Sequence, residues 1–397
     1  MNTENTLSRT GTFLYDAALI LFLIQRIFRS TMLNYSVEEG MYMSLMHYLF
    51  LLPVLLLAVK ILFFQDVFHS SLMRSVPFWI VSALLAVSTW ISRDITIFSV
   101  WIFVVAAPDT NFDSTVRITL YCEAALTLAI VLFSTAGLIP TQTFYSSGVG
   151  SHPFTRYSLG FVHPNSLGLY TFHIVSCLVY LRRNKPMLPS LLVLIAASVF
   201  NFFITNSRTS VMCSILLLLC MIVYRVLSTK KTEKREKAMK FFMRVLIAGS
   251  CLIMISCLLL SLNYDIPLVQ GLDHLLSLRF YYISNVFSAH SITWLGNPPF
   301  TIDGPFDNTY MLILLNNGIL LYAAVSVLFI YLMIFLTSRK KYAEVILLFV
   351  YSCYAMMESN IFSVGKCVFI LLFSVLLFTG PQEKKMELTG EDSPERV

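Results

Sequence analysis

The stretch VLIAGSCLIMISCLLLSL, residues 245–262, carries no charged side chain, and the basic stretch STKKTEKREKAMKFFMR, residues 228–244, lies directly before it. A helix that crosses the hydrocarbon core of a bilayer needs roughly 20 mainly apolar residues. Lys and Arg beside such a helix prefer the cytoplasmic side. The two stretches therefore predict a membrane-spanning helix that follows a basic cytoplasmic loop over 228–244.

Apolar runs of similar length recur along all 397 residues, of which 57% are hydrophobic and 13% charged. A water-soluble domain carries about 25% charged residues, so the composition excludes a soluble globular enzyme, a disordered protein and a nucleic-acid binder. Only helices and closed barrels satisfy the backbone in lipid, and these runs are too long for barrel strands. We expect an all-α polytopic membrane helical bundle, a single integral membrane domain over 1–397, with twelve spans at about 11–28, 44–64, 76–91, 94–108, 116–137, 159–181, 188–205, 209–227, 244–263, 309–337, 342–357 and 361–379.

The basic residues give this bundle an orientation. Counting spans outward from 228–244 places both termini in the cytoplasm, together with Arg182, Arg183, Lys185, Arg339, Lys340, Lys341, Lys384 and Lys385. Since positive charge on the outer side opposes the usual preference, an outer arginine beside the mouth of the bundle is a candidate ligand-binding residue. Seven of the 28 basic residues fall there: Arg26, Arg29, Arg93, Arg156, Arg208, Arg279 and Lys366.

Two outer connections are long, at 138–158 and 264–308, where most others are short. Long ordered loops on a rigid scaffold are where binding and catalytic residues concentrate. The eight cysteines form no CxxC pair and fall in or beside apolar runs, so we interpret them as core residues without a metal role. The two extracytoplasmic loops are therefore the expected location of the functional site.

The first candidate motif is HPFTRYSLGFVHPNSLGLY, residues 152–170. If a helix begins near Tyr157, Arg156 and His163 lie on roughly one face, seven residues apart. Pro164 disfavours helical geometry at His163, so we expect a kink there, with His163 and Asn165 lining a polar notch. The alternative is a kinked helix whose polar pair is satisfied internally and has no ligand.

The second motif is the turn FNFFITNSRTSVM, residues 200–212, between two predicted spans. Its polar residues can cap the neighbouring helices. Arg208 then projects beside a helix N-terminus, whose free N–H groups also attract anions. The alternative is an arginine that anchors the turn at the lipid headgroups.

The third motif joins SLRFYYISNVFS, residues 277–288, to LGNPPFTIDGPFDNTYMLILLNNG, residues 295–318. Arg279 suits bidentate phosphate binding, and a sugar could stack on neighbouring rings such as Tyr282. Asp307 and Asn308 suit the N-cap of the helix that follows. Asp307 could alternatively be a general base at the mouth of the bundle.

The sequence contains no Walker motif, no dinucleotide-binding glycine loop, no zinc-binding His pair and no Asp-rich metal motif. Outer arginines with a His, an Asp and aromatic residues indicate a metal-independent site, without a cofactor, for a lipid substrate that bears phosphate and sugar.

The segments TRYSLGFVHPNSLG, TNSRTS and DNTYMLILLNNG, in this order over about 150–320, together resemble the Wzy-type polymerases of O-antigen, capsule and exopolysaccharide repeat units, within the O-antigen ligase-like superfamily. The resemblance implies a GT-C-like bundle in a bacterial inner or plasma membrane and an undecaprenyl-diphosphate-linked oligosaccharide as substrate. A flippase and a chain-length regulator would be partners, and nucleic acid would not. On this interpretation Asp307, His163 and Arg279 are catalytic, with Asp307 or His163 as the base, and the substrate-binding residues are Arg156, Arg208, Asn165, Asn308, Tyr310 and Tyr282.

The sequence also departs from these families. Ligases typically carry His, then Asn, Ser or Gln, where this chain has Asp307 and Asn308, which disfavours transfer to a lipid A core. An Arg and a Gly separated by ten residues describe some polymerases, whereas eleven residues separate Arg156 from Gly168. Two other functions stay open, a ligase that transfers finished glycan and a lipid-linked oligosaccharide flippase. A flippase is expected to have a central charged cavity and related halves, which this sequence does not display.

Overall fold

The computed structural model describes residues 2–35, 39–64, 75–146, 154–229, 232–276, 278–300 and 306–378, and most of these are helical. The predicted all-α class is confirmed. The helices are α1 (Asn2–Arg29), α2 (Glu39–Val59), α3 (Val76–Ser92), α4 (Thr96–Val105), α5 (Phe112–Thr135), α6 (Pro164–Leu181), α7 (Leu188–Phe200), α8 (Arg208–Ser228), α9 (Glu233–Leu262), α10 (Pro267–Leu275), α11 (Arg279–Ala289), α12 (Thr309–Ser338), α13 (Tyr342–Met357) and α14 (Ser374–Phe378), and the strands are β1 (Thr143–Ser146) and β2 (Phe154–Tyr157).

Seven helices of the described chain are long and apolar enough to cross a membrane: Ser8–Arg29, Gly40–Phe64, Phe112–Thr135, Leu188–Thr205, Arg208–Ser228, Glu233–Leu262 and Thr309–Ser338. Each overlaps one of the predicted runs, although the helix Glu233–Leu262 begins well before its run at 244–263. The other five runs form α3, α4 and α13, which are shorter, α6, which is 18 residues long but more polar, and a short final helical segment at Val368–Phe378. The chain is therefore a polytopic helical membrane protein.

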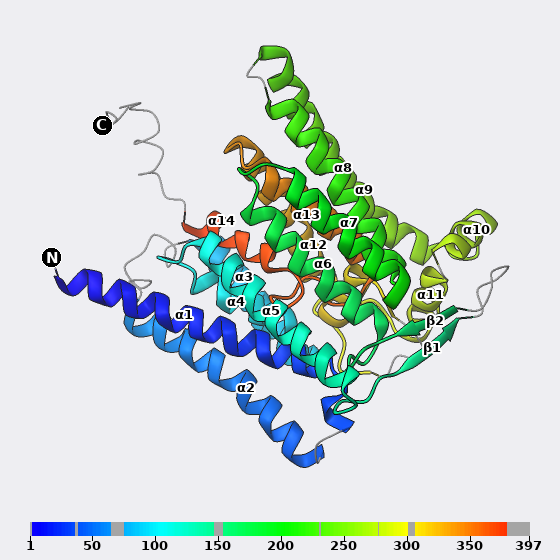
Figure 1. The fold of residues 1–397 in the computed structure, drawn as a ribbon, viewed down its shortest axis with the longest axis horizontal. Helices are drawn as coiled ribbons and strands as arrows, with labels where there is room; N and C mark the ends of the chain where they lie inside the picture. Colours follow the sequence, from blue (N-terminus) through cyan, green and yellow to red (C-terminus); the bar gives the residue numbers. More distant parts are fainter. Residues whose placement is uncertain are drawn as a thin grey trace.

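Helix α13 lies at the centre of the bundle. It packs against α8, α9 and α12, while α1 packs on α2 and α5, and α5 packs on α6 (Figure 1). Its sequence, YAEVILLFVYSCYAMM, is apolar on nearly all sides, and most of its side chains are buried. A helix that is apolar around its whole circumference is buried by its neighbours. Because other helices surround α13, its C-terminal end lies between them.

The two predicted long loops lie together at one end of the bundle. The antiparallel hairpin β1–β2, in which Phe144 pairs with Arg156, lies near α10 and α11, away from the turn between α8 and α9 (Figure 1). Residues 147–153, 277 and 301–305 of these loops, with His152 and Asp303, lie outside the described residues. The basic stretch 228–244 and the predicted outer loops thus occupy different ends.

Helix α6 begins at Pro164, so the prediction of a helix from about Tyr157 with a kink at His163 was wrong. Proline fits the first position of a helix because it lacks the N–H that would be unpaired there, and it forces the preceding residue into extended geometry. His163 has φ −145° and ψ 145° and is the N-cap. Arg156 lies on strand β2, so it shares no helical face with His163.

The predicted loop over 228–244 is mostly helical, because α9 starts at Glu233. Ion pairs one turn apart stabilise this first part of the helix, at 2.7 Å between Glu233 and Lys237 and 3.1 Å between Glu236 and Lys240. Lys230, Lys231, Lys384, Lys385 and the C-terminus lie outside the described residues.

The predicted last span is not a continuous helix. Residues 358–367 are irregular, and only Val368–Phe373 and α14 are helical. Thr309 fixes the start of the irregular segment: its hydroxyl donates to the Glu358 carbonyl at 2.6 Å and accepts from the Ile361 N–H at 3.0 Å. Irregular backbone at membrane depth is tolerated where protein surrounds it, and Ile361, Val364 and Cys367 are fully buried.

The opposite positions of α11 and the α8–α9 turn generate a test of orientation. Ser288 on α11 and Ser228 at the end of α8 are both exposed. In intact cells, a membrane-impermeant maleimide should label a Ser288→Cys protein, and it should label Ser228→Cys only after permeabilisation. The unsubstituted chain, with its own eight cysteines, supplies the background signal. The reverse labelling pattern would show that the bundle has the opposite orientation, with the hairpin, α10 and α11 on the cytoplasmic side.

Candidate active site

Arg156 connects three segments at the end of the bundle that carries the hairpin. Its Nε donates to the Thr205 carbonyl at 3.0 Å, and an Nη2 hydrogen bond reaches the Asn165 side-chain oxygen. Burial lowers the pKa of Arg156; the Glu358 carboxylate opposes this effect, and Arg208 and Arg279 add to it. The charges of these residues therefore act on one another, although they come from distant parts of the sequence.

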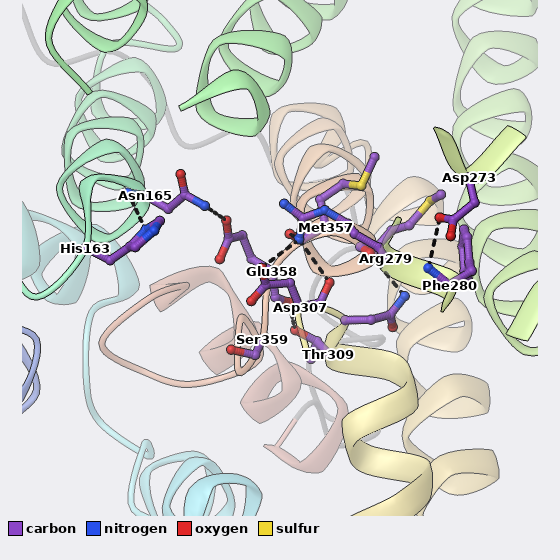
Figure 2. A network of polar contacts seen from close by, with 12 residues as sticks. His163, Asn165, Asp273, Arg279, Phe280, Asp307, Thr309, Met357, Glu358 and Ser359 are labelled. Atoms are coloured by element: carbon purple, nitrogen blue, oxygen red, sulfur yellow. Dashed lines mark hydrogen bonds and ion pairs between the residues drawn. The ribbon is translucent and has the colours of Figure 1, made fainter. Parts of the chain in front are cut away.

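Glu358 is the central acidic group of the site. It directly follows α13, is 8% exposed, and its Oε1 accepts a hydrogen bond from Asn165 Nδ2 at 3.0 Å (Figure 2). Burial, and then the neighbouring charge of Asp307, raises the pKa of Glu358 to about 7, against the opposing effect of Arg279. A carboxyl group with this pKa can accept a proton near neutral pH.

Arg279 and Asp307 form the second part of the site. Arg279 is the first residue of α11, and its Nη1 lies 3.1 Å from Asp307 Oδ2 while also donating to the Met357 carbonyl (Figure 2). The side chains are 16% and 30% exposed, respectively. The pair therefore lies beside the end of α13, next to Glu358, with part of its surface accessible.

Asp273 fixes the start of α11 and hence the position of Arg279. Its carboxylate accepts from the Phe280 N–H at 2.9 Å and from the Tyr281 N–H at 2.8 Å, and the residue is fully buried. A carboxylate on the free N–H groups of a first helical turn stabilises the helix end. Asp273 was not among the predicted site residues, and it acts on the site through the backbone of α11.

His163 lies beside this network without occupying its centre. Its Nδ1 accepts from the Asn165 N–H at 3.1 Å, and its ring contacts that of Phe144 with centroids 4.8 Å apart. Burial, and then the charge of Arg156, lowers the pKa of His163, so the ring is neutral at pH 7. A neutral His163 with Nδ1 as acceptor orients the first turn of α6, and with it Asn165.

Arg208 is the first residue of α8 and is exposed. No described residue pairs with its guanidinium group, in contrast to Arg156 and Arg279. The predicted capping in this turn is absent at Ser207, which makes no side-chain cap hydrogen bond. The charge of the exposed Arg208 side chain therefore remains available to an anion.

Asn308 and Tyr310, two predicted substrate-binding residues, face the protein interior. Asn308 is the N-cap of α12: its Oδ1 accepts from the Met311 N–H at 3.0 Å, and its Nδ2 donates to the Met356 carbonyl at 3.1 Å. Tyr310 is 1% exposed, and its hydroxyl donates to the Ser352 carbonyl at 3.0 Å. Both side chains are used in joining α12 to α13, so the expectation that they bind substrate has no support in their positions.

Tyr282 lies in a short row of aromatic rings beside Arg279. Its ring centroid is 5.5 Å from that of Tyr281, which is 5.7 Å from that of Tyr264. Tyr281 is 41% exposed and Tyr282 is half-buried. The row offers ring faces and edges for contact with a sugar next to the charged network.

Sequence reasoning missed Glu358 and gave no role to Lys366. Lys366 donates to the Ser359 carbonyl at 2.9 Å, within the same irregular segment. The signal was an acidic residue in ESN, residues 358–360, between two apolar runs. Loop length gives no indication of this site, because only a few residues separate the two apolar runs.

The assembled site can bind a polyanion beside a carboxyl group that titrates near neutrality. The described chain places no group of three or more His, Cys, Asp or Glu side chains where they could hold a metal ion. No protein-family model, curated protein or solved structure matches the chain. The assignment of a function therefore depends on the geometry and on the three sequence motifs.

The N-cap role of Asn308 generates a prediction about stability. Asn308→Ala removes the cap acceptor and should lower the free energy of unfolding by about 1 to 2 kcal/mol. Asn308→Ser keeps a capping oxygen and should lose less. Thermal and denaturant unfolding in detergent measure both. If the Asn308→Ala protein had wild-type stability but lost its enzymatic activity, Asn308 would instead be a substrate-binding residue.

Proposed function

We propose that this protein is a polysaccharide polymerase that joins undecaprenyl-diphosphate-linked oligosaccharide repeat units at the outer face of a bacterial inner or plasma membrane. The proposal includes the twelve-span, GT-C-like arrangement and the cytoplasmic termini expected from the sequence. The observation that supports it is that the charges of Arg156 and Arg279 act on Glu358, and that of Arg208 acts on Arg156, at one end of an apolar bundle. The flippase and chain-length regulator partners are part of the same proposal.

The arginines would hold the diphosphate of the donor. A guanidinium group donates two parallel hydrogen bonds to phosphate, and fixed positive charge stabilises the negative charge that builds up on a departing diphosphate. Arg208 is the most accessible of the three. Arg156 and Arg279 are fixed by backbone carbonyls, so they would meet the substrate with little reorganisation.

Glu358 is the proposed general base. The acceptor sugar hydroxyl would give its proton to Glu358 while its oxygen forms a bond to the anomeric carbon of the donor. The bond from that carbon to the phosphate oxygen would break, and its electron pair would leave with the diphosphate. Asp307 is already paired with Arg279, and His163 Nδ1 is already an acceptor, so Glu358 suits this role better than the two bases expected from the sequence.

A ligase and a flippase remain the alternative functions. The ligase would use the same donor chemistry with a different acceptor. For a flippase, the charged network should lie in a central cavity that opens to both sides, whereas this network lies at the end of α13 next to the hairpin and α11 (Figures 1 and 2). That position favours the polymerase over the flippase.

The glycan made by a deletion strain separates the three functions. Loss of a polymerase should leave single repeat units on the surface, and loss of a ligase should leave long chains that are not delivered. Loss of a flippase should trap the units inside. Purified protein in liposomes with purified lipid-linked units should produce polymer without other enzymes, and failure in both assays would overturn the proposal.

Replacing each arginine by lysine tests its role as a phosphate ligand. Lysine keeps the charge but not the two-pronged geometry, so Arg156→Lys, Arg208→Lys and Arg279→Lys should each reduce polymer formation sharply at equal protein level. Arg29→Lys, at the end of α1, is the matched control and should leave polymer unchanged. Normal polymer from all three site variants would make these arginines structural or interfacial residues.

The pH dependence separates the candidate bases. With Glu358 as the base, the rate should rise with pH up to about 7, the pKa of that group, and then level off. Glu358→Gln should lower the rate on the order of 10²- to 10⁴-fold. Because the charge of Asp307 raises the pKa of Glu358, the Asp307→Asn protein should stay active. The rising part of its pH–rate profile, here called the pH limb, should shift to lower pH. An inactive Asp307→Asn protein beside an active Glu358→Gln protein would instead identify Asp307 as the base.

A further inference from the structure

A second acidic group, Glu123, is buried where α5 packs on α6. Glu123 of α5 and His173 of α6 are both fully buried, and Glu123 Oε2 lies 2.9 Å from His173 Nδ1. Despite this short distance, neither carboxylate oxygen has a well-aligned hydrogen bond within the described chain. Ionisable residues inside a membrane bundle are costly and are usually retained for function.

The other ring nitrogen of His173 contacts the irregular segment. Its Nε2 accepts a hydrogen bond from the Val368 N–H at 3.1 Å, where the irregular residues 358–367 end and the helical turn Val368–Phe373 begins. Because Nε2 is an acceptor, the ring proton of neutral His173 must be on Nδ1, which faces Glu123. The Glu123 carboxyl group lies 2.9 Å from Nδ1, so this close contact restricts the orientations open to the ring, although it is not an aligned hydrogen bond.

The irregular segment is therefore held at both ends by side chains from other elements. Thr309 of α12 binds the backbone at Glu358 and Ile361, and His173 of α6 binds it at Val368. Between these two attachments lies Lys366, which donates to the Ser359 carbonyl at 2.9 Å. Within the segment, short turns bond Ser363 to Ile361 and Lys366 to Ser363, and the two attachments fix these turns relative to α12 and α6.

We propose that His173, held in orientation by Glu123, is a positioning residue for the active site: it anchors the segment that carries Glu358 and Lys366. This inference rests on the proposed function for its kinetic consequences, although the anchoring itself does not. Misplacement of a catalytic group by about 1 Å can cost on the order of 10²-fold in rate. The pair would thereby influence chemistry from outside the substrate site.

Three substitutions test the anchor. His173→Leu removes the acceptor and should lower the polymerisation rate on the order of 10²-fold, shift the pH limb near 7, and speed amide hydrogen exchange across 359–370. His173→Gln offers an amide oxygen to the Val368 N–H. It should restore most of the polymerisation rate, the wild-type pH limb and the slow amide exchange across 359–370. Glu123→Gln keeps a neutral acceptor for the ring and should give an intermediate result.

Thr171→Val is the matched control, because Thr171 lies on the same helix and, among the described residues, its hydroxyl donates only to the Leu167 carbonyl within α6. It should leave all three measurements unchanged. Wild-type exchange across 359–370 in a folded His173→Leu protein would overturn the anchor, whatever the activity. Faster amide exchange across 359–370, together with a wild-type polymerisation rate and a wild-type pH limb, would show that the anchor does not affect the active site. A wild-type protein that makes no polymer would refute the proposed function alone, and exchange would still decide on the anchor.

Discussion

A carboxyl group at the end of a buried apolar helix must have its polar atoms and charge met by neighbouring residues, because unpaired buried charge costs several kcal/mol. Glu358 is that group here. Asn165 donates to it, Arg156 holds the oxygen of Asn165, and Arg156 is held by the Thr205 carbonyl. This chain of contacts connects the end of α13 to α6, β2 and the turn before α8.

The same constraint explains the other side of the network. Arg279 meets Asp307 and the carbonyl at the end of α13, and Asp273 fixes the helix turn from which Arg279 projects. With both sides fixed, positive groups from separate elements face Glu358 without a continuous motif in the sequence. Such fixed charges suit a substrate whose own charge changes during reaction, because little reorganisation is needed.

The irregular segment 358–367 is what makes this arrangement possible in a membrane protein. A regular helix would satisfy its own backbone and would continue the direction of α13 or turn back in a short loop. Here, Thr309 and His173 supply partners at the two ends of the segment and local turns supply others, so the backbone can bend and present Glu358 and Lys366 at the end of the bundle. The cost is a buried Glu123–His173 pair between α5 and α6.

The sequence by itself determined the class of protein, because the length and apolarity of the runs depend only on the thickness of the bilayer and the need to pair backbone groups. Its motifs also included Arg156, Asn165, Arg279 and Asp307, which the structure brings into the polar network around Glu358. It could not establish that Asn308, rather than Asp307, caps α12, because both residues are good caps and only the fold directs one of them to the Met311 N–H. Glu358 acquired its place only in the tertiary structure: its hydrogen bond to Asn165 spans 193 residues of sequence, and it forms because buried polar atoms must find partners wherever the packed helices bring them.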